Sequence, residues 1–258
     1  MADFKYISVL TLKEEGGLSN DKNDSASNYP SPYVYKGKRG WHTNKGITYQ
    51  TFVIASRNLG FKNSYDNFIK MPYAIWYKIA KIAFWDGLRL DEIKSQSISN
   101  LLYSWNWAGG SGWKNRVQKY FRSKGIEWKQ NNIKSLPKNI NAITDKYGEK
   151  KVSDDLFEQY RKFYKSIGTR ANPRTAKHPE GIFTNGWLNR VNRLQEYSNK
   201  FITFTKKNKG IGGIVLLGLG LGVLYIVKKK KKQINIKKVG NYNENKTYII
   251  GNRGNFSG

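Results

Sequence analysis

The feature that most constrains this chain is an uncharged run of 18 residues, GIGGIVLLGLGLGVLYIV, at positions 210–227. As an α-helix this run is about 27 Å long, close to the thickness of a bilayer core. Lysines stand on both sides of it, at 206, 207 and 209 and at 228–232. The alternative is a buried core helix, but the flanking lysines and six glycines disfavour one in a water-soluble protein.

The run divides the chain into parts of different character. We expect residues 206–232 to form a lysine-flanked transmembrane helix that contacts a membrane through Ile211–Val227. The polar residues 233–258 are expected to be a flexible tail. Residues 1–205 remain for folding in water, which suits one compact domain.

Charge and composition narrow the set of partners and cofactors. The chain has 46 Lys and Arg against 18 Asp and Glu, a net charge of +28 that favours polyanions such as nucleic acid, anionic lipid or wall polymers. No motif of a nucleic-acid-binding module is present, so we expect no specific nucleic acid partner. With no Cys and two His, the chain lacks the usual ligands of a metal site, and we expect no metal and no cofactor.

Apolar periodicity and the positions of Gly and Pro predict a mainly α-helical soluble part. A polar stretch at 18–45, with prolines and glycines, predicts a loop or irregular hairpin after the first helix. The predicted helices are 4–14, 47–59, 72–86, 91–107, 113–124, 137–147, 153–167 and 185–204.

The first helix ends in LKEEGGLSND, residues 12–21, which places a carboxylate against a glycine pair. Hydrolysis of a glycoside needs a proton donor for the leaving oxygen and a second group on the opposite ring face. Glu15 is the candidate donor. Asp24 follows with eight residues between, and Thr43 and Thr48 come later, in HTNKGIT.

These motifs, E-G-G, N-D-x-x-D and T-N-K-G-I-T in this order, resemble glycoside hydrolase family 108. Its members are lysozyme-like N-acetylmuramidases, often encoded by phages as endolysins. The resemblance implies an enzyme that cleaves the glycan backbone of peptidoglycan, with Glu15 as general acid. It assigns Asp24 to the oxocarbenium-like state or to a water, and Thr43 or Thr48 to that water.

The resemblance also implies a fold and a domain order. The fold is a lysozyme-like α+β domain with a small irregular or β lobe after the first helix, plus the single apolar helix near the C-terminus. Residues 1–90 would form the catalytic half. Residues 91–205 would form a helical half, in which Gly186–Val191 resembles the last helix of a predicted peptidoglycan-binding module.

The chain departs from the family between Asp24 and Thr43, where 18 residues, 25–42, replace a short linker. This insertion contains Tyr35 and Trp41, and could be a sugar-stacking wall, a docking surface or a block to the cleft. We take Asn44, Thr48, Trp41 and Tyr35 as the candidate substrate-binding residues.

The expected mechanism makes two further predictions about the carboxylates. Partial burial beside aromatic rings would raise the pKa of Glu15, so that it holds a proton near neutrality. Neighbours on a helix point about 100° apart, which would turn Glu14 toward solvent. A separation of about 6.5–9.5 Å between the carboxyls of Glu15 and Asp24 would indicate inversion, and about 5–5.5 Å retention.

Three readings of function follow. In the first, the chain is a muramidase that acts on the cell wall from the host membrane or from a phage virion, with phage structural or lysis proteins as partners and no cleavable signal peptide. In the second, a catalytically silent virion or membrane protein binds peptidoglycan on the same fold. In the third, charge and aromatic residues bind single-stranded nucleic acid.

Overall fold

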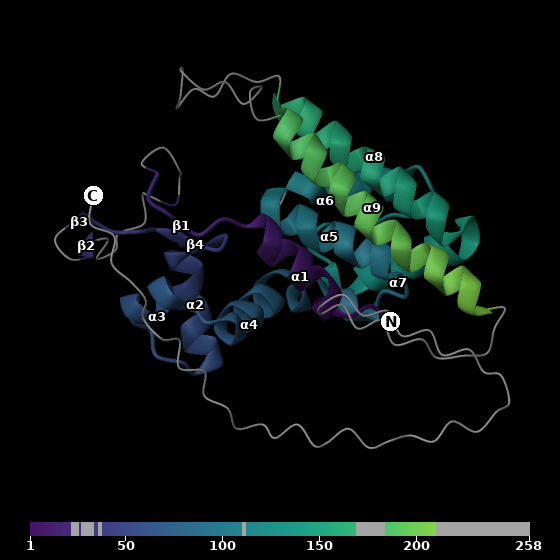
Figure 1. Ribbon diagram of the computed structural model, residues 1–258. Helices are drawn as coiled ribbons and strands as arrows, with labels where there is room; N and C mark the ends of the chain where they lie inside the picture. The colour runs from purple at the N-terminus through teal and green to yellow at the C-terminus, as the bar shows by residue number, and fades with distance from the viewer. Residues whose placement is uncertain (22–25, 27–33, 36–37, 110–111, 169–183, 210–258) are drawn as a thin grey trace, which may run out of the picture. The chain divides into compact units, whose positions relative to one another are not determined.

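The first helix leads directly to the candidate carboxylate. In the computed structural model (Figure 1), α1 spans Phe4–Glu14, and the Asp3 side chain caps it by accepting a 2.9 Å hydrogen bond from Lys5 N–H. The backbone turns out of the helix at Glu15, which is extended with φ −81° and ψ 136°. The helix therefore ends before the glycine pair, and neither Gly16 nor Gly17 takes a left-handed conformation.

A small antiparallel sheet follows, as the expected lobe. Strands β1 (Leu18–Ser19), β4 (Thr43–Asn44) and β5 (Ile47–Thr48) pair in the order β1-β4-β5. A second pair is formed by β2 (Val34–Tyr35) and β3 (Lys38–Arg39). All of these strands are two residues long, which explains why an alternating pattern does not stand out in the sequence.

Helices make up most of the rest of the described chain, close to the predicted pattern. The sequence missed α3, a six-residue helix too short to show a period. The remaining elements are α2 Tyr49–Leu59, α3 Tyr65–Lys70, α4 Tyr73–Phe84, η2 Asp86–Leu88, η3 Leu90–Glu92, α5 Gln96–Gly109, α6 Trp113–Arg122, η5 Ile133–Ser135, α7 Leu136–Tyr147, α8 Glu149–Gly168 and α9 Thr184–Lys209.

Aromatic side chains join the first helix to the helices behind it. The Phe4 ring lies 4.8 Å from that of Tyr77 on α4 and 5.2 Å from that of Tyr103 on α5, measured between centroids. Trp105 on α5 stacks on Tyr160 of α8 at 4.6 Å. All of these rings except Tyr77 are buried, so α5 is a central helix against which α1, α4 and α8 pack.

The last described helix, α9, contacts the first helix, α1. Helix α9 packs along α5 and α8 (Figure 1), and buries Val191 and Leu194. Tyr197 on α9 donates a 2.7 Å hydrogen bond to the carbonyl oxygen of Tyr6 on α1. This contact ties the far end of the described chain to the helix that ends at Glu15.

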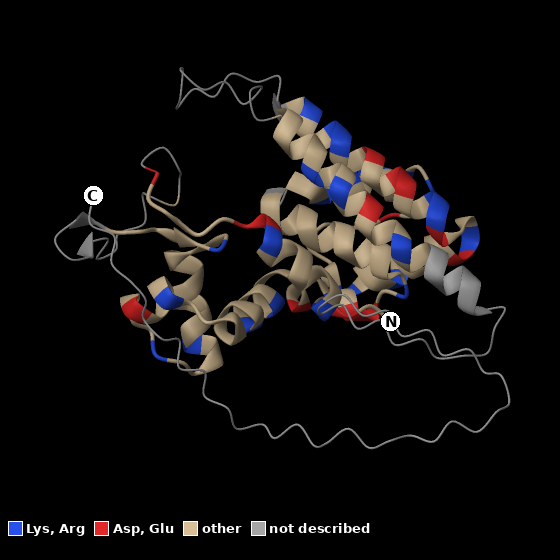
Figure 2. Cartoon of the chain, viewed as in Figure 1, with Lys and Arg blue, Asp and Glu red and all other residues tan. Residues whose placement is uncertain are grey.

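The structure describes residues 1–21, 26, 34–35, 38–109, 112–168 and 184–209, which lie within one compact unit, Met1–Ile214. Lys and Arg are found on α2, α4, α8 and α9 (Figure 2), so basic side chains are spread over the folded part. Within this described part no helix combines the length and apolar character needed to cross a bilayer. The apolar helix predicted at 210–227 lies outside it.

Candidate active site

Glu15 stands where α1 gives way to the sheet. Its backbone N–H still donates to the carbonyl oxygen of Thr11, at 2.9 Å, as the last bond of the helix. Its side chain is only 14 % exposed. The carboxyl group is therefore held at the junction of the helix and the β lobe.

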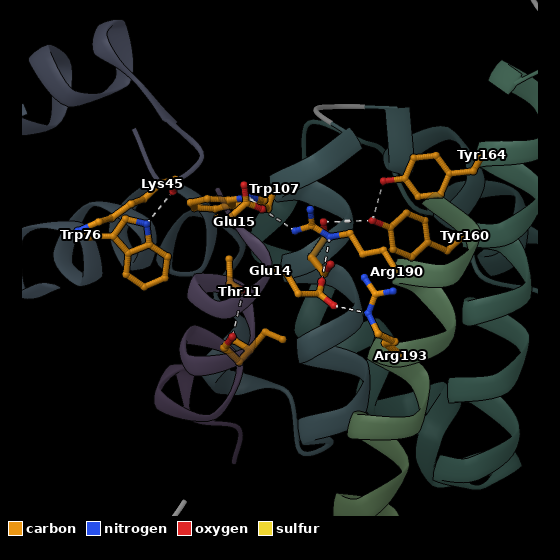
Figure 3. Close-up of polar contacts among 12 residues, drawn as sticks. Thr11, Glu14, Glu15, Lys45, Trp76, Trp107, Tyr160, Tyr164, Arg190 and Arg193 are labelled. Carbon is orange, nitrogen blue, oxygen red and sulfur yellow. Dashed lines mark hydrogen bonds and ion pairs between the residues drawn. The ribbon is translucent and has the colours of Figure 1, made fainter. Parts of the chain in front are cut away.

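Two donors converge on one oxygen of this carboxyl group (Figure 3). The indole N–H of Trp107, on α5, donates to Oε1 of Glu15 at 2.8 Å. The guanidinium Nη2 of Arg190, on α9, donates to the same Oε1 at 2.7 Å. The site thus unites side chains from the start, the middle and the far end of the described chain.

The hairpin turn between β4 and β5 closes on the other oxygen. Lys45 and Gly46 have φ values of 48° and 75°, the positive values that a two-residue hairpin turn requires. A Cβ atom on Gly46 would lie 2.5 Å from Oε2 of Glu15 and 2.6 Å from Cζ2 of Trp107. Both the backbone angle and the space therefore require glycine in the T-N-K-G-I-T motif. The indole N–H of Trp76 fixes the turn by donating to the Lys45 carbonyl at 3.0 Å.

The prediction that Glu14 faces solvent is wrong. Its side chain is 12 % exposed, and its Oε1 accepts a 2.9 Å hydrogen bond from Nε of Arg193. Its Oε2 lies 3.3 Å from Nε of Arg190. Because α9 packs beside this face of α1, the carboxylate meets two arginines, which the geometry of a single helix does not reveal.

Arg190 therefore lies between two carboxylates. Burial alone would lower the pKa of its guanidinium, but the adjacent Glu15 carboxylate and, to a smaller extent, Glu14 outweigh this and raise the pKa. Arg190 remains charged at every pH at which the protein would work. It supplies a fixed positive charge to the site.

Three tyrosines surround this charge: Tyr103 on α5, and Tyr160 and Tyr164 on α8. Burial raises the pKa of all three phenols, so they stay neutral. The hydroxyls of Tyr160 and Tyr164 are 3.2 Å apart, and Tyr160 also donates to the carbonyl oxygen of Ser104 at 3.2 Å. Among the described residues, Arg190 is the charged group that contacts Glu15 directly.

Thr43 and Thr48, the predicted water-binding residues, face each other as partners in the β4–β5 ladder. The Thr43 hydroxyl is 2.9 Å from Nδ1 of His42. The Thr48 hydroxyl caps α2 by accepting from the N–H of Thr51 at 3.2 Å. Thr48 therefore has a structural task, and the catalytic role of Thr43 stays a prediction.

The predicted substrate-binding residues occupy different environments. Asn44 is buried, and its amide donates to the carbonyl oxygens of Phe68 at 2.7 Å and Ile69 at 2.9 Å. Trp41 packs partly buried against the core. Asp24 and the side chain of Tyr35 lie outside the described residues. The binding roles of Asn44, Thr48, Trp41 and Tyr35, and the catalytic role of Asp24, stay predictions.

A comparison with known families covers part of the chain that forms this site. Residues 9–110 match the family model described as Glycosyl hydrolase 108. The predicted resemblance to this family is confirmed over these residues. No curated protein and no solved structure matches the chain.

The glycosyl hydrolase 108 region supports a glycoside hydrolase, and it contains Glu15, Gly46 and Trp107. It extends past the predicted boundary after residue 90 and ends where α5 ends. Arg190 comes from α9, beyond the region. The peptidoglycan-binding role of residues 91–205 and the domain boundaries stay predictions. A mainly helical fold with a small antiparallel sheet agrees with the α-rich, lysozyme-like fold that the family implies.

Sequence reasoning missed three residues of the site: Gly46, Trp107 and Arg190. Gly46 and Arg190 lay in stretches that the resemblance had marked without giving these residues a task, namely 43–48 and 186–191, and Trp107 was the last residue of the predicted helix 91–107. The sequence therefore does not show that these three residues come together at Glu15. Within the described residues, no group of three or more His, Asp or Glu side chains is placed to hold a metal ion.

Proposed function

We propose that the chain is a peptidoglycan hydrolase of the N-acetylmuramidase type, with Glu15 as its general acid. The observation that carries the proposal is the Glu15 carboxyl, 14 % exposed and held by Trp107 against the hairpin turn within the family region. Such a group can pass a proton to the glycosidic oxygen while the second carboxyl, Asp24, acts from the other ring face.

The test is hydrolysis of bacterial peptidoglycan by the purified full chain, with the new reducing ends identified by mass spectrometry. We expect N-acetylmuramic acid ends from the wild type and a loss of about 100- to 10,000-fold in the Glu15→Gln variant. Glu158→Gln, the same change at a 47 % exposed position on α8, is the matched control and should retain full activity.

An unchanged melting temperature would show that Glu15→Gln is folded. Undiminished release by that variant would remove Glu15 from the mechanism. Release of N-acetylglucosamine ends would leave a glycoside hydrolase of the other backbone linkage.

The second candidate is a catalytically silent protein that binds peptidoglycan. It is favoured by one observation, the engagement of Glu15 with the Arg190 guanidinium at 2.7 Å, since an ion pair of this kind is also found in purely structural networks. Sedimentation of the wild type with peptidoglycan, without release of any reducing end, would decide for this candidate.

The proposal extends to the place of action. The enzyme would reach the wall from the host membrane or from a phage particle, with residues 210–227 as the membrane contact and phage structural or lysis proteins as partners. The uncharged run between two lysine clusters supports this. Binding of the full chain to anionic lipid vesicles in high salt, where surface charges are screened, would separate insertion from simple attraction of a polycation.

A further inference from the structure

The two oxygens of Glu15 have different surroundings. Oε1 accepts both hydrogen bonds, one from Trp107 at 2.8 Å and one from Arg190 at 2.7 Å. Oε2 faces the turn between β4 and β5, which approaches it so closely that a Cβ atom on Gly46 would lie 2.5 Å from it. Trp107 and Arg190 can only donate hydrogen bonds to Glu15, because an indole N–H and a guanidinium have no acceptor atom.

Arg190 is held in place independently of Glu15. Helix α9 is anchored to α1 by the Tyr197 hydroxyl, which donates to the Tyr6 carbonyl at 2.7 Å. The second carboxylate, Glu14, lies 3.3 Å from Nε of Arg190 and balances part of its charge. The Arg190 side chain is 21 % exposed, so it has little freedom to leave. Contacts besides the Glu15 pair therefore help to hold its guanidinium in place.

We propose that Arg190 is a positioning residue for Glu15: together with Trp107 it occupies Oε1 and leaves Oε2 to carry the proton that is transferred. This inference rests on the proposed glycosidase function. It places an essential part of the site on α9, outside the family region.

The proton transfer can be written atom by atom. The Oε2–H bond of Glu15 breaks as a new O–H bond forms on the glycosidic oxygen. The bond between that oxygen and the anomeric carbon breaks, and its electron pair stays with the leaving oxygen. The anomeric carbon, left electron-deficient, forms its new bond on the opposite ring face, to a water oxygen or to the second carboxylate. Glu15 is left as a carboxylate, whose negative charge Arg190 already faces. The same contact thus orients the acid before the step and stabilises its conjugate base afterwards.

Kinetics of three variants test the proposal. In Arg190→Gln we expect kcat to fall about 100-fold with KM within about twofold, because the acid is misplaced while the sugar sites remain. Arg190→Lys keeps the charge and should restore part of this loss. Arg193→Gln is the matched control. Arg193 lies one turn away on α9 and is 57 % exposed, and in the described part of the chain its ion pair is with Glu14. The kcat of this variant should stay within about twofold of wild type.

A spectroscopic readout keeps the inference separate from the activity. The indole N–H resonance of Trp107 reports on its hydrogen bond to Glu15, and can be assigned with Trp107→Phe. We expect this resonance to shift in Arg190→Gln and Arg190→Lys, and to stay in place in Arg193→Gln. If Arg190→Gln does not fold, as judged by its melting curve, Arg190→Lys carries the same test.

The outcomes are distinct. An inactive wild type in which the resonance still shifts would remove the glycosidase function and leave Arg190 as the residue that positions Glu15. An active wild type whose kcat and Trp107 resonance are unaffected by changes at Arg190 would overturn the inference. Equal losses in the Arg190 and Arg193 variants would also overturn it, since they would indicate a general effect on α9.

Discussion

At the scale of single residues, Gly46 is constrained both by its positive φ angle and by its closeness to the Glu15 carboxyl. Gly46→Ala should cost about 1–3 kcal/mol of stability, because alanine disfavours a φ of 75°. The added Cβ would also lie 2.5 Å from Oε2 of Glu15, too close for contact, and would push the carboxyl away from the turn. We therefore expect a loss of glycan cleavage beyond the loss of stability, measured by reducing-end release at a temperature where the variant is fully folded.

Gly60 provides the matched control for this change. Its φ is 68°, so Gly60→Ala should be strained to a similar extent, but no atom lies within 4 Å of the added Cβ. Gly60→Ala should thus be destabilised and fully active once folded. Equal activity of the two alanine variants would mean that the turn does not constrain Glu15.

Residue types in a local pattern could be predicted from the sequence, and their partners could not. The Glu15 carboxylate was predicted from its place at a helix end before two glycines, and the structure puts it there. The fate of Glu14 was missed because Arg190 and Arg193 approach from a helix 175 residues or more along the chain. Amphipathic spacing describes the faces of one helix, and carries no information on which other helix covers a face.

At the scale of elements, Asn44 is a link between the β4–β5 hairpin and α3. Both of its amide hydrogen bonds end on carbonyl oxygens at the end of α3, at 2.7 and 2.9 Å. Asn44→Ala would leave these buried acceptors without their donor, and we expect it to lower the free energy of unfolding by about 1–3 kcal/mol. The measurement is urea denaturation.

Kinetics on the same variant would separate structure from binding. If Asn44 acts only through the fold, KM for soluble glycan fragments should stay within about twofold at a temperature where the variant is folded. A KM that rises tenfold in a variant of unchanged stability would instead establish Asn44 as the substrate ligand that the sequence predicted.

Elements themselves were predictable in proportion to their length. Every described helix of ten residues or more was found from its apolar period, with ends displaced by a few residues. The six-residue α3 and the two-residue strands escaped, since two residues cannot display an alternation. The hairpin turn at Lys45–Gly46 matters more for the site than any of these strands, and its importance follows from contact with Glu15 rather than from local sequence.

At the scale of the whole molecule, five phenols are buried well enough to change how stability depends on pH. Burial is the main cause that raises the pKa of each, and for Tyr197 the value is about 12. The neutral phenol is the form that the folded state accommodates, so the fold binds these protons more tightly than the unfolded chain does. The five are Tyr103, Tyr120, Tyr160, Tyr164 and Tyr197.

These raised pKa values mean that the protein loses stability as pH rises above about 10. The stability that these phenols contribute is complete below the ordinary tyrosine pKa of about 10, and is lost as pH rises through the raised values. Near pH 10 the net charge is close to zero, because the isoelectric point is about 10.0, whereas at pH 7 it is +28. Repulsion between like charges is thus weakest where the loss begins, and it grows again at higher pH as the net charge becomes negative.

We therefore expect the melting temperature to hold or rise between pH 7 and 10, as the positive charge falls, and then to drop steeply between about pH 10 and 12. Thermal melts at fixed ionic strength measure this, with tyrosinate absorbance recorded in parallel. Tyr197→Phe, which removes one buried phenol and its bond to Tyr6, should start from a lower melting temperature and show a shallower drop. A drop of the same slope in the wild type and in Tyr197→Phe would show that Tyr197 ionises without opening the contact between α9 and α1. The loss of stability at alkaline pH would then not involve α9, the helix that carries Arg190.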